Sequence, residues 1–190
     1  ANEKVKKPEV PQAETTTRGE IYDWMQSLVF ALIISIIVFI FIFRIVDVSG
    51  DSMNPTLING DKLVVSDVFY KPKQGDIVIF RKDEYKAEAL VKRVIATEGQ
   101  TIEIDFDRGR VYVDGELLDE PYIAEPTRNQ LDFQGPQKVP EGCVFVMGDN
   151  RNASSDSRRA EIGMVDERLI VGKVLLRIFP LDSIGVPDGE

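Results

Sequence analysis

The longest apolar run of the sequence lies near its N-terminus, between Ser27 and Phe43. Apart from Ser27 and Ser35 every residue of the run is apolar, and a helix of this length extends about 25 Å at about 1.5 Å per residue. Apolar and aromatic neighbours bring the length close to the roughly 30 Å hydrocarbon thickness of a bilayer. These neighbours are Tyr22, Trp24, Ile45 and Val46. The pattern predicts a single transmembrane helix, with the anchor at residues 21–46.

A buried core helix and a cleaved export signal are two other interpretations of this run. A core helix would show a polar stripe along its exposed side, and this run shows none. Val48, Ser49 and Gly50 resemble the small-residue cleavage site of an export signal, but the apolar run is longer than the core of such a signal. We therefore favour a permanent membrane anchor.

The N-terminal tail, residues 1–20, is polar, contains Pro8 and Pro11, and has too few apolar residues to fold by itself. Basic residues concentrate on this side of the apolar run, whereas Arg44 alone follows the run directly. They are Lys4, Lys6, Lys7 and Arg18. By the positive-inside rule, this distribution predicts a disordered cytoplasmic tail and a single-pass cell-membrane protein whose large C-terminal part is extracytoplasmic.

Beyond the apolar run, the sequence takes on the two-residue alternation of β-strands. Ile102, Ile104 and Phe106 share one face of such a strand, and Asp114 with Gly115 supplies a tight turn after a later one. The predicted strands are Lys62–Val65, Asp76–Arg81, Leu90–Ala96, Thr101–Phe106, Arg110–Val113, Val144–Met147 and Val171–Phe179. Residues 47–190 are therefore predicted to form one mainly β domain.

The composition excludes several classes of active site. The 190 residues contain no histidine, so the chain can form neither a Ser-His-Asp triad nor a histidine-ligated metal site. We expect no metal and no cofactor. The one cysteine, Cys143, adjoins apolar residues and has no basic neighbour there, so we interpret it as a small core residue. The net charge of −9 argues against nucleic acid as a partner.

A nucleophilic serine in this chain needs a base other than histidine, and Lys92 is the candidate. Ser52 lies in a segment rich in turn-forming residues, where a serine commonly has only a structural role. Lys92 and Arg93 interrupt an apolar strand, so we expect one of them to point inward. Burial would lower the pKa of a lysine and leave an amine able to take the serine proton. An edge strand whose charges prevent aggregation explains the same pattern equally well.

A third polar segment, residues 148–158, follows the predicted strand Val144–Met147. It is dense in small polar side chains, among them Ser154, and in charged ones such as Asp156 and Arg158. Such a segment can form an ordered, hydrogen-bonded loop. Composition alone favours a solvated loop held by local turns and by surface ion pairs.

In their order along the chain, these segments resemble the type I signal peptidases, a family of proteases with a Ser-Lys catalytic dyad. The resemblance covers nearly all the chain after the tail. Its motifs are Ser52–Leu57, Gly75–Phe80, Lys92–Arg93, Leu118–Tyr122 and Gly148–Arg158. Each motif alone is short, and their order along one chain carries the resemblance.

The resemblance implies a role for each matching residue. Ser52 would be the nucleophile and Lys92 the general base, and the backbone N–H of Ser52 would stabilise the oxyanion. Ser154 falls where the family has a serine that orients the lysine. Asp156 and Arg158 fall where a salt bridge supports the loop. The walls of a shallow apolar substrate pocket would be Val48, Met53, Leu57, Leu90 and Val91.

The sequence departs from the family pattern in two places. Some relatives carry a serine two positions before the nucleophile as a second oxyanion donor, and here that residue is Gly50. The family often continues after the lysine with Gly-x-Pro-Gly-Asp, whereas the segment Ala96–Gln100 keeps only Gly99 of that turn. The first departure leaves the second oxyanion donor open, and the second concerns the local turn rather than the dyad.

By the resemblance, a signal-peptidase or LexA-like β domain removes signal peptides from exported preproteins at Ala-x-Ala-like sites. Its partners would be those signal peptides and the lipid bilayer. Self-cleaving repressors of the LexA type share the dyad, but the membrane anchor and the lack of a basic recognition helix argue against this alternative. A non-catalytic, membrane-tethered β module is the second alternative, and it requires Lys92 to be solvated and distant from Ser52.

Overall fold

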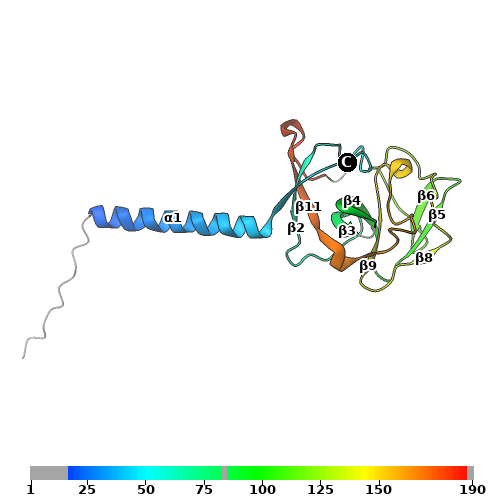
Figure 1. Cartoon of the computed structure of the whole chain (residues 1–190), viewed down its shortest axis with the longest axis horizontal. Coiled ribbons are helices and arrows are strands. Elements are labelled where there is room, and N and C mark those ends of the chain that lie inside the picture. The colour runs from blue at the N-terminus through cyan, green and yellow to red at the C-terminus, as the bar shows by residue number, and fades with distance from the viewer. Residues whose placement is uncertain (1–16, 83–84, 188–190) are drawn as a thin grey trace, which may run out of the picture. The chain divides into compact units, whose positions relative to one another are not determined.

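The computed structural model describes residues 17–82 and 85–187 (Figure 1). The chain divides between Phe41 and Ile42 into two compact units. The described part of the first unit belongs to helix α1, Thr17–Ile42, and the second unit contains the strands. Most of the predicted tail, residues 1–16, lies outside the described residues.

Helix α1 covers the predicted apolar run as far as Ile42. It is 26 residues long, and its segment Gly19–Ile42 is long and apolar enough to cross a membrane. Residues 20–41 are all exposed, so α1 is not a buried core helix. The hydroxyl groups of Ser27 and Ser35 each donate a 2.8 Å hydrogen bond to the carbonyl oxygen four residues earlier. Both polar side chains are therefore satisfied within the helix, as a lipid environment requires.

The helix ends earlier than the predicted anchor. Ile45 and Val46, which were predicted to extend the anchor, belong instead to strand β1, Arg44–Asp47. This strand pairs with β2, Lys62–Ser66, and Val46 packs against buried residues of the β domain. Two apolar residues after a helix are compatible with a strand as well as with the end of a membrane span. Here their pairing with β2 makes them part of a strand.

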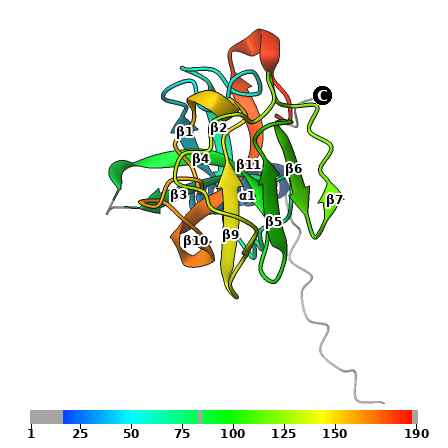
Figure 2. The same cartoon turned by 90° about the vertical axis from the view of Figure 1, so that its right-hand side faces the viewer.

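The larger sheet of the β domain has seven antiparallel strands in the order β1-β2-β11-β3-β4-β9-β10 (Figures 1 and 2). Its further members are β3 (Ile77–Lys82), β4 (Lys86–Ala96), β9 (Cys143–Met147), β10 (Val165–Asp166) and β11 (Ile170–Phe179). Short 3₁₀ helices form at Arg151–Ala153, Glu167–Leu169 and Leu181–Ser183. Strand β4 lies inside this sheet, between β3 and β9.

A smaller sheet has the strand order β7-β6-β5-β8 and lies beside β9 (Figure 2). Its strands are β5 (Thr101–Asp105), β6 (Arg110–Val113), β7 (Glu116–Leu117) and β8 (Gln137–Lys138). The turn between β6 and β7 places Asp114 and Gly115 at φ values of 52° and 83°, the left-handed region that such a two-residue turn needs. Gly99 has a φ of 81°, so the altered segment after Lys92 keeps its turn glycine.

Each strand predicted from the sequence is present, with small shifts at most ends. Strand β4 begins at Lys86, well before the predicted Leu90. The short strands β1, β7, β8 and β10 were not predicted. Strands this short carry no alternation of their own, and their pairing partners define them.

Buried apolar residues form three clusters, and β4 contributes to each of them. Ile95 belongs to the cluster that packs the smaller sheet against β9. Val91 borders the cluster beneath the loop between β1 and β2. Val94 belongs to the third cluster, together with residues of β3 and β9. Strand β4 is therefore the element around which the domain packs.

Candidate active site

Ser52 lies in the tight loop between β1 and β2. The loop closes through backbone hydrogen bonds, among them that from Leu57 N–H to the carbonyl oxygen of Met53 (2.9 Å). Met53 and Leu57 are 1% and 0% exposed, so their side chains anchor the loop in the core. Ser52 itself is half-buried. The core thus fixes the loop while its serine hydroxyl stays accessible.

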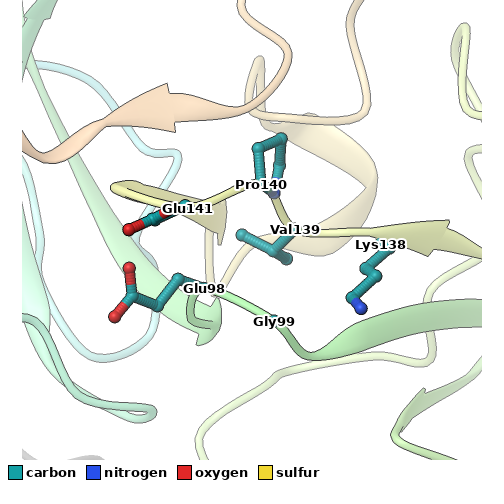
Figure 3. A pocket seen from close by; sticks show the side chains of 6 residues that line it. All are labelled: Glu98, Gly99, Lys138, Val139, Pro140 and Glu141. Carbon is teal, nitrogen blue, oxygen red and sulfur yellow. The ribbon is translucent and has the colours of Figure 1, made fainter.

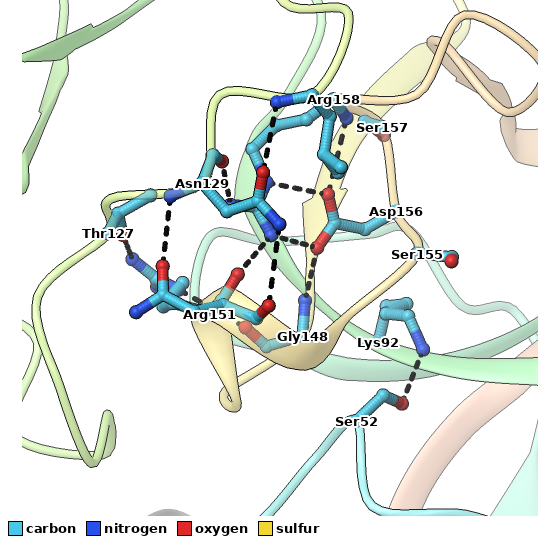
Figure 4. A network of polar contacts seen from close by, with 12 residues as sticks. Ser52, Lys92, Thr127, Asn129, Gly148, Arg151, Ser155, Asp156, Ser157 and Arg158 are labelled. Carbon is cyan, nitrogen blue, oxygen red and sulfur yellow. Dashed lines mark hydrogen bonds and ion pairs between the residues drawn. The ribbon is translucent and has the colours of Figure 1, made fainter. Parts of the chain in front are cut away.

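Lys92 reaches this hydroxyl from the middle of the larger sheet (Figure 4). Its Nζ atom donates hydrogen bonds to Ser52 Oγ at 2.7 Å and to the carbonyl oxygen of Val91 at 2.8 Å. Only 2% of Lys92 is exposed. Because β4 lies between β3 and β9, the edge-strand interpretation of Lys92 is wrong. A serine hydroxyl and a buried lysine amine are thus in direct contact.

Arg93 is buried as well, so both cations of this strand lie inside the domain, where one was expected. Its Nε and Nη2 atoms donate to Asp149 Oδ1 and Oδ2 at 2.9 Å and 2.7 Å. The side chains of Arg93 and Asp149 are 3% and 0% exposed. Thr56 Oγ1 donates to Asp149 Oδ2 at 2.6 Å. This network joins the Ser52 loop, strand β4 and the segment after β9.

Tyr122 extends the network on the Arg93 side. The guanidinium carbon of Arg93 lies 3.9 Å from the centre of the Tyr122 ring, and that of Arg151 lies 5.8 Å from it. Burial, followed by the negative charge of Glu120, raises the pKa of the Tyr122 phenol, so the ring stays neutral. A neutral aromatic face between two cations provides cation–π stabilisation for both.

Arg151 is fully buried and makes its own ion pair. Its Nη1 atom donates to Glu120 Oε2 at 2.9 Å and to Thr127 Oγ1 at 3.0 Å, and Nη2 donates to Glu120 Oε1. Burial opposes the charge of Arg151, but the hydrogen bonds and charge of Glu120 raise its pKa. Arg151 therefore links the segment that carries Tyr122 to the segment after β9.

The segment 148–158 is an ordered, buried loop, so the solvated-loop interpretation is wrong. Asp156 and Arg158 form a 2.8 Å salt bridge, and both side chains are 0% exposed. Asp156 Oδ2 also accepts a hydrogen bond from the Gly148 N–H at 3.1 Å. Arg158 Nη2 donates to the carbonyl oxygen of Arg151 at 2.6 Å. The salt bridge thus fixes both ends of the loop (Figure 4).

This buried loop touches the Ser52 loop at Gly148. A Cβ atom added to Gly148 would lie 2.3 Å from both Ser154 Oγ and the carbonyl oxygen of Ser52. Asn150 N–H donates to that carbonyl oxygen at 3.0 Å. Ser154 is 6% exposed, and within residues 17–82 and 85–187 its hydroxyl group has no hydrogen-bond partner. Close to the Ser52 loop there is therefore a buried hydroxyl group, that of Ser154, which can still form hydrogen bonds.

The residues predicted to line a substrate pocket separate into two groups. Val48, Met53, Leu57 and Val91 belong to one apolar cluster beneath the Ser52 loop. Leu90 packs in a different cluster, with Phe80 and Val94, so it does not share that cluster, and the pocket wall stays a prediction. Neighbouring strand residues face opposite sides of a sheet, which separates Leu90 from Val91.

A cavity of about 470 Å³ opens beside the turn after β4 and strand β8 (Figure 3). It is lined by Glu98, Gly99, Lys138, Val139, Pro140 and Glu141. None of the residues predicted to act in catalysis lines it. The cavity is therefore separate from the contact between Ser52 and Lys92.

Cys143 packs at the border of the cluster beneath the smaller sheet. Burial, followed by the charges of Asp166 and Glu167, raises the pKa of its thiol, which keeps the sulfur protonated and unreactive. In the described part of the chain, no group of three acidic or cysteine residues could hold a metal ion.

Sequence reasoning missed Asp149 and Tyr122 as parts of this site. Both lie in segments that match motifs of the signal peptidases, so these segments were expected to matter, but the roles of the two residues were not predicted. Their partner, Arg93, lies on another strand, far from both along the chain. A single sequence does not reveal such a pairing.

The chain is similar in sequence to known signal peptidases. The family model described as signal peptidase, peptidase S26, matches residues 21–179. A signal peptidase I of Bacillus licheniformis is 35% identical, over 93% of this chain and 98% of the relative. Signal peptidase I P of Bacillus subtilis subsp. natto is 39% identical, over 90% of this chain and 96% of the relative.

A crystal structure of a signal peptidase I from Enterococcus faecalis is also similar. It shares 30% sequence identity and a TM-score of 0.44, covering 55% of this chain and 97% of that chain. Because the family model and the Bacillus relatives span most of the sequence, the chain belongs to the signal peptidase family, peptidase S26, as a serine endopeptidase of the type I signal peptidases.

Proposed function

We propose that this enzyme cleaves preproteins at Ala-x-Ala-like sites, with Ser52 as the nucleophile and Lys92 as the general base. The contact of 2.7 Å between Lys92 Nζ and Ser52 Oγ carries this proposal. Lys92 is 2% exposed, and burial disfavours a protonated ammonium. The contact argues against a non-catalytic β module, which requires a solvated lysine far from Ser52.

The proposed reaction follows from this contact. The amine of Lys92 takes the proton of Ser52 Oγ as that oxygen attacks the carbonyl carbon of the scissile peptide bond. Lys92 then passes the proton to the departing amine, which leaves an acyl-enzyme on Ser52. A water molecule, activated by the same lysine, hydrolyses the ester and restores both groups. Arginine could not replace Lys92, because its guanidinium group stays protonated.

Backbone and side-chain groups around Ser52 and Lys92 would assist these reaction steps. The backbone N–H of Ser52 is the proposed donor to the oxyanion. Position 50 offers no hydroxyl group, and the N–H of Gly50 already donates to Asn59 Oδ1 at 3.0 Å. We assign to Ser154 the positioning of Lys92, since its hydroxyl group is buried, forms no hydrogen bond among the described residues and is therefore available to the lysine. The salt bridge between Asp156 and Arg158 holds the loop that carries Ser154.

The proposed membrane topology follows from α1 and the charges around it. The segment Gly19–Ile42 would span the bilayer, with the lysine-rich N-terminus in the cytoplasm and the β domain on the extracytoplasmic face. The chain between Ile42 and Ser52 can extend at most about 35 Å. The nucleophile therefore lies within this distance of the end of the proposed span, on the side where a membrane-embedded signal peptide presents its cleavage site.

Cleavage of a preprotein with an Ala-x-Ala site, by the full chain in detergent, tests the function. We expect cleavage at that site by the wild type and a loss of roughly 10⁴-fold to 10⁶-fold in Ser52→Ala, because the nucleophile is gone. Ser183→Ala removes a serine hydroxyl outside the site and serves as the control. Absence of cleavage by a folded wild type, or full activity in Ser52→Ala, would contradict the proposal.

A second prediction concerns the contact between the two loops. In Gly148→Ala the new methyl group collides with the carbonyl oxygen of Ser52, so the nucleophile must move. We expect cleavage to fall about 100-fold and the free energy of unfolding to fall by roughly 1–3 kcal/mol. The measurements are initial cleavage rates and urea unfolding.

Gly185→Ala is the matched control, because a Cβ atom there has no neighbour within 4 Å. It should leave cleavage and stability at the wild-type level. Wild-type cleavage by Gly148→Ala would show that the tight packing of the two loops is not needed for the reaction.

A further inference from the structure

The loop between β2 and β3, residues 67–76, exposes apolar side chains that nothing in the described chain covers. Phe69 is 102% exposed and Val68 is 46% exposed. Phe69 also has a φ of 52°, a conformation that side chains other than glycine rarely adopt. A strained backbone that holds an aromatic ring in solvent is typical of a binding surface.

Lysine side chains line a cavity together with this ring. A cavity of about 590 Å³ beside it is lined by Phe69, Tyr70 and Leu175 together with Lys71, Lys73 and Lys173. Its one carboxylate, that of Asp76, is already bound by Lys173 at 2.6 Å and by the Tyr70 hydroxyl at 2.7 Å. Lys71 and Lys73 are exposed and make no ion pair with any residue of 17–82 or 85–187. The wall is therefore both apolar and cationic, in a chain whose net charge is −9.

The same loop lies at the end of the sheet where the chain enters from α1. Arg44 pairs in register with Val65, the penultimate residue of β2, and neighbouring strands lie about 4.8 Å apart. The guanidinium group of Arg44 also lies 3.6 Å from the carboxylate of Asp67, at the start of the loop. By chain length, Arg44 is at most about 7 Å from Ile42, where α1 ends. The loop therefore begins close to the end of the proposed membrane span.

We propose that the loop 67–76 docks on the bilayer and binds the phosphate group of an anionic phospholipid. Phe69 and Val68 would enter the interfacial layer, while Lys71 and Lys73 contact the phosphate, as aromatic and basic residues do at membrane surfaces. This inference rests on the proposed insertion of α1 in the membrane. Docking would add a second point of attachment and fix the height of the Ser52 loop above the lipid.

Tryptophan fluorescence of the full chain in vesicles tests the docking. Trp24 is the one tryptophan of the sequence, so Trp24→Phe/Phe69→Trp reports on the loop alone. We expect strong quenching by lipids brominated near the headgroup when the vesicles contain phosphatidylglycerol. Trp24→Phe/Leu117→Trp, at a position 54% exposed in the smaller sheet, is the control and should not be quenched. Equal quenching at both positions, or none at Phe69→Trp, would overturn the proposal.

The charge of the lipid provides a second test. Adding Lys71→Gln or Lys73→Gln to the Phe69→Trp variant should lower the ratio of docked to undocked loop about fivefold per lysine in anionic vesicles. Neither change should matter in phosphatidylcholine vesicles. If millimolar inorganic phosphate abolishes the quenching, the site binds free phosphate, and the lipid assignment is wrong.

Cleavage assays separate this inference from the proposed function. In detergent, Phe69→Ser should cleave the Ala-x-Ala preprotein at the wild-type rate, because Phe69 lies outside the dyad and its loop network. Loss of cleavage in every variant, with quenching retained, would contradict the function and leave the docking intact. Normal cleavage without quenching would overturn the docking alone.

Discussion

Replacing Lys92 by methionine will abolish cleavage and leave the protein folded. Methionine fills much of the lysine volume, and removing a buried cation in favour of an apolar group need not destabilise a protein. The substitution removes the proposed base for Ser52, so we expect the cleavage rate to fall by roughly 10⁴-fold or more. Lys92→Arg should be equally inactive, because arginine stays protonated. Cleavage rates and thermal unfolding measure the two effects.

Lys62→Met is the matched control for this variant. Lys62 also lies on a strand of the larger sheet, but 46% of its side chain is exposed and it pairs with Asp47. It should keep full activity. Unfolding of Lys92→Met under conditions in which the control stays folded would favour a structural lysine, and cleavage by Lys92→Met would exclude Lys92 as the base.

Replacing Asp149 by alanine will cause the largest loss of stability that we expect from one substitution outside the apolar core. Arg93 would remain buried without its carboxylate, and Thr56 would lose its acceptor. Breaking a buried pair in this way costs about 3–5 kcal/mol. Because the pair also ties the Ser52 loop to β4, cleavage should fall with stability. Urea unfolding gives the free energy directly.

The control is the exposed ion pair of Asp47 and Lys62, whose N–O distance equals that of the Arg93–Asp149 pair. Both salt bridges measure 2.7 Å, but the side chains of Asp47 and Lys62 are 68% and 46% exposed. Asp47→Ala should therefore cost no more than about 1 kcal/mol. Equal costs for the two substitutions would mean that burial does not decide the contribution of the Arg93–Asp149 pair.

Local patterns were sufficient to predict much of the fold. Alternating residues located β5 and β6, and the Asp114-Gly115 turn between β6 and β7 has the conformation that its sequence favours. An apolar run without a polar stripe located α1. Each of these signals lies within one segment, which is why one sequence was enough.

The candidate site could be predicted only in part. The absence of histidine left Lys92 as the candidate base for Ser52, and the structure places the two side chains in contact. The burial of the loop after β9 was not predictable, because its small polar residues suit a solvated loop equally well. Its burial depends on partners such as Asn129, whose carbonyl oxygen accepts from Arg158 across the fold.

The position of β4 in all three apolar clusters limits how such an enzyme can be redesigned. A substitution in this strand changes the packing of one or more of these clusters. The residues beside Lys92 therefore tolerate few changes of size or polarity. Altered cleavage preferences should therefore be sought by changing the accessible edges of the Ser52 loop. Directed evolution that targets β4 would mostly return unfolded protein, whereas a library confined to the loop would sample new specificities on an intact scaffold.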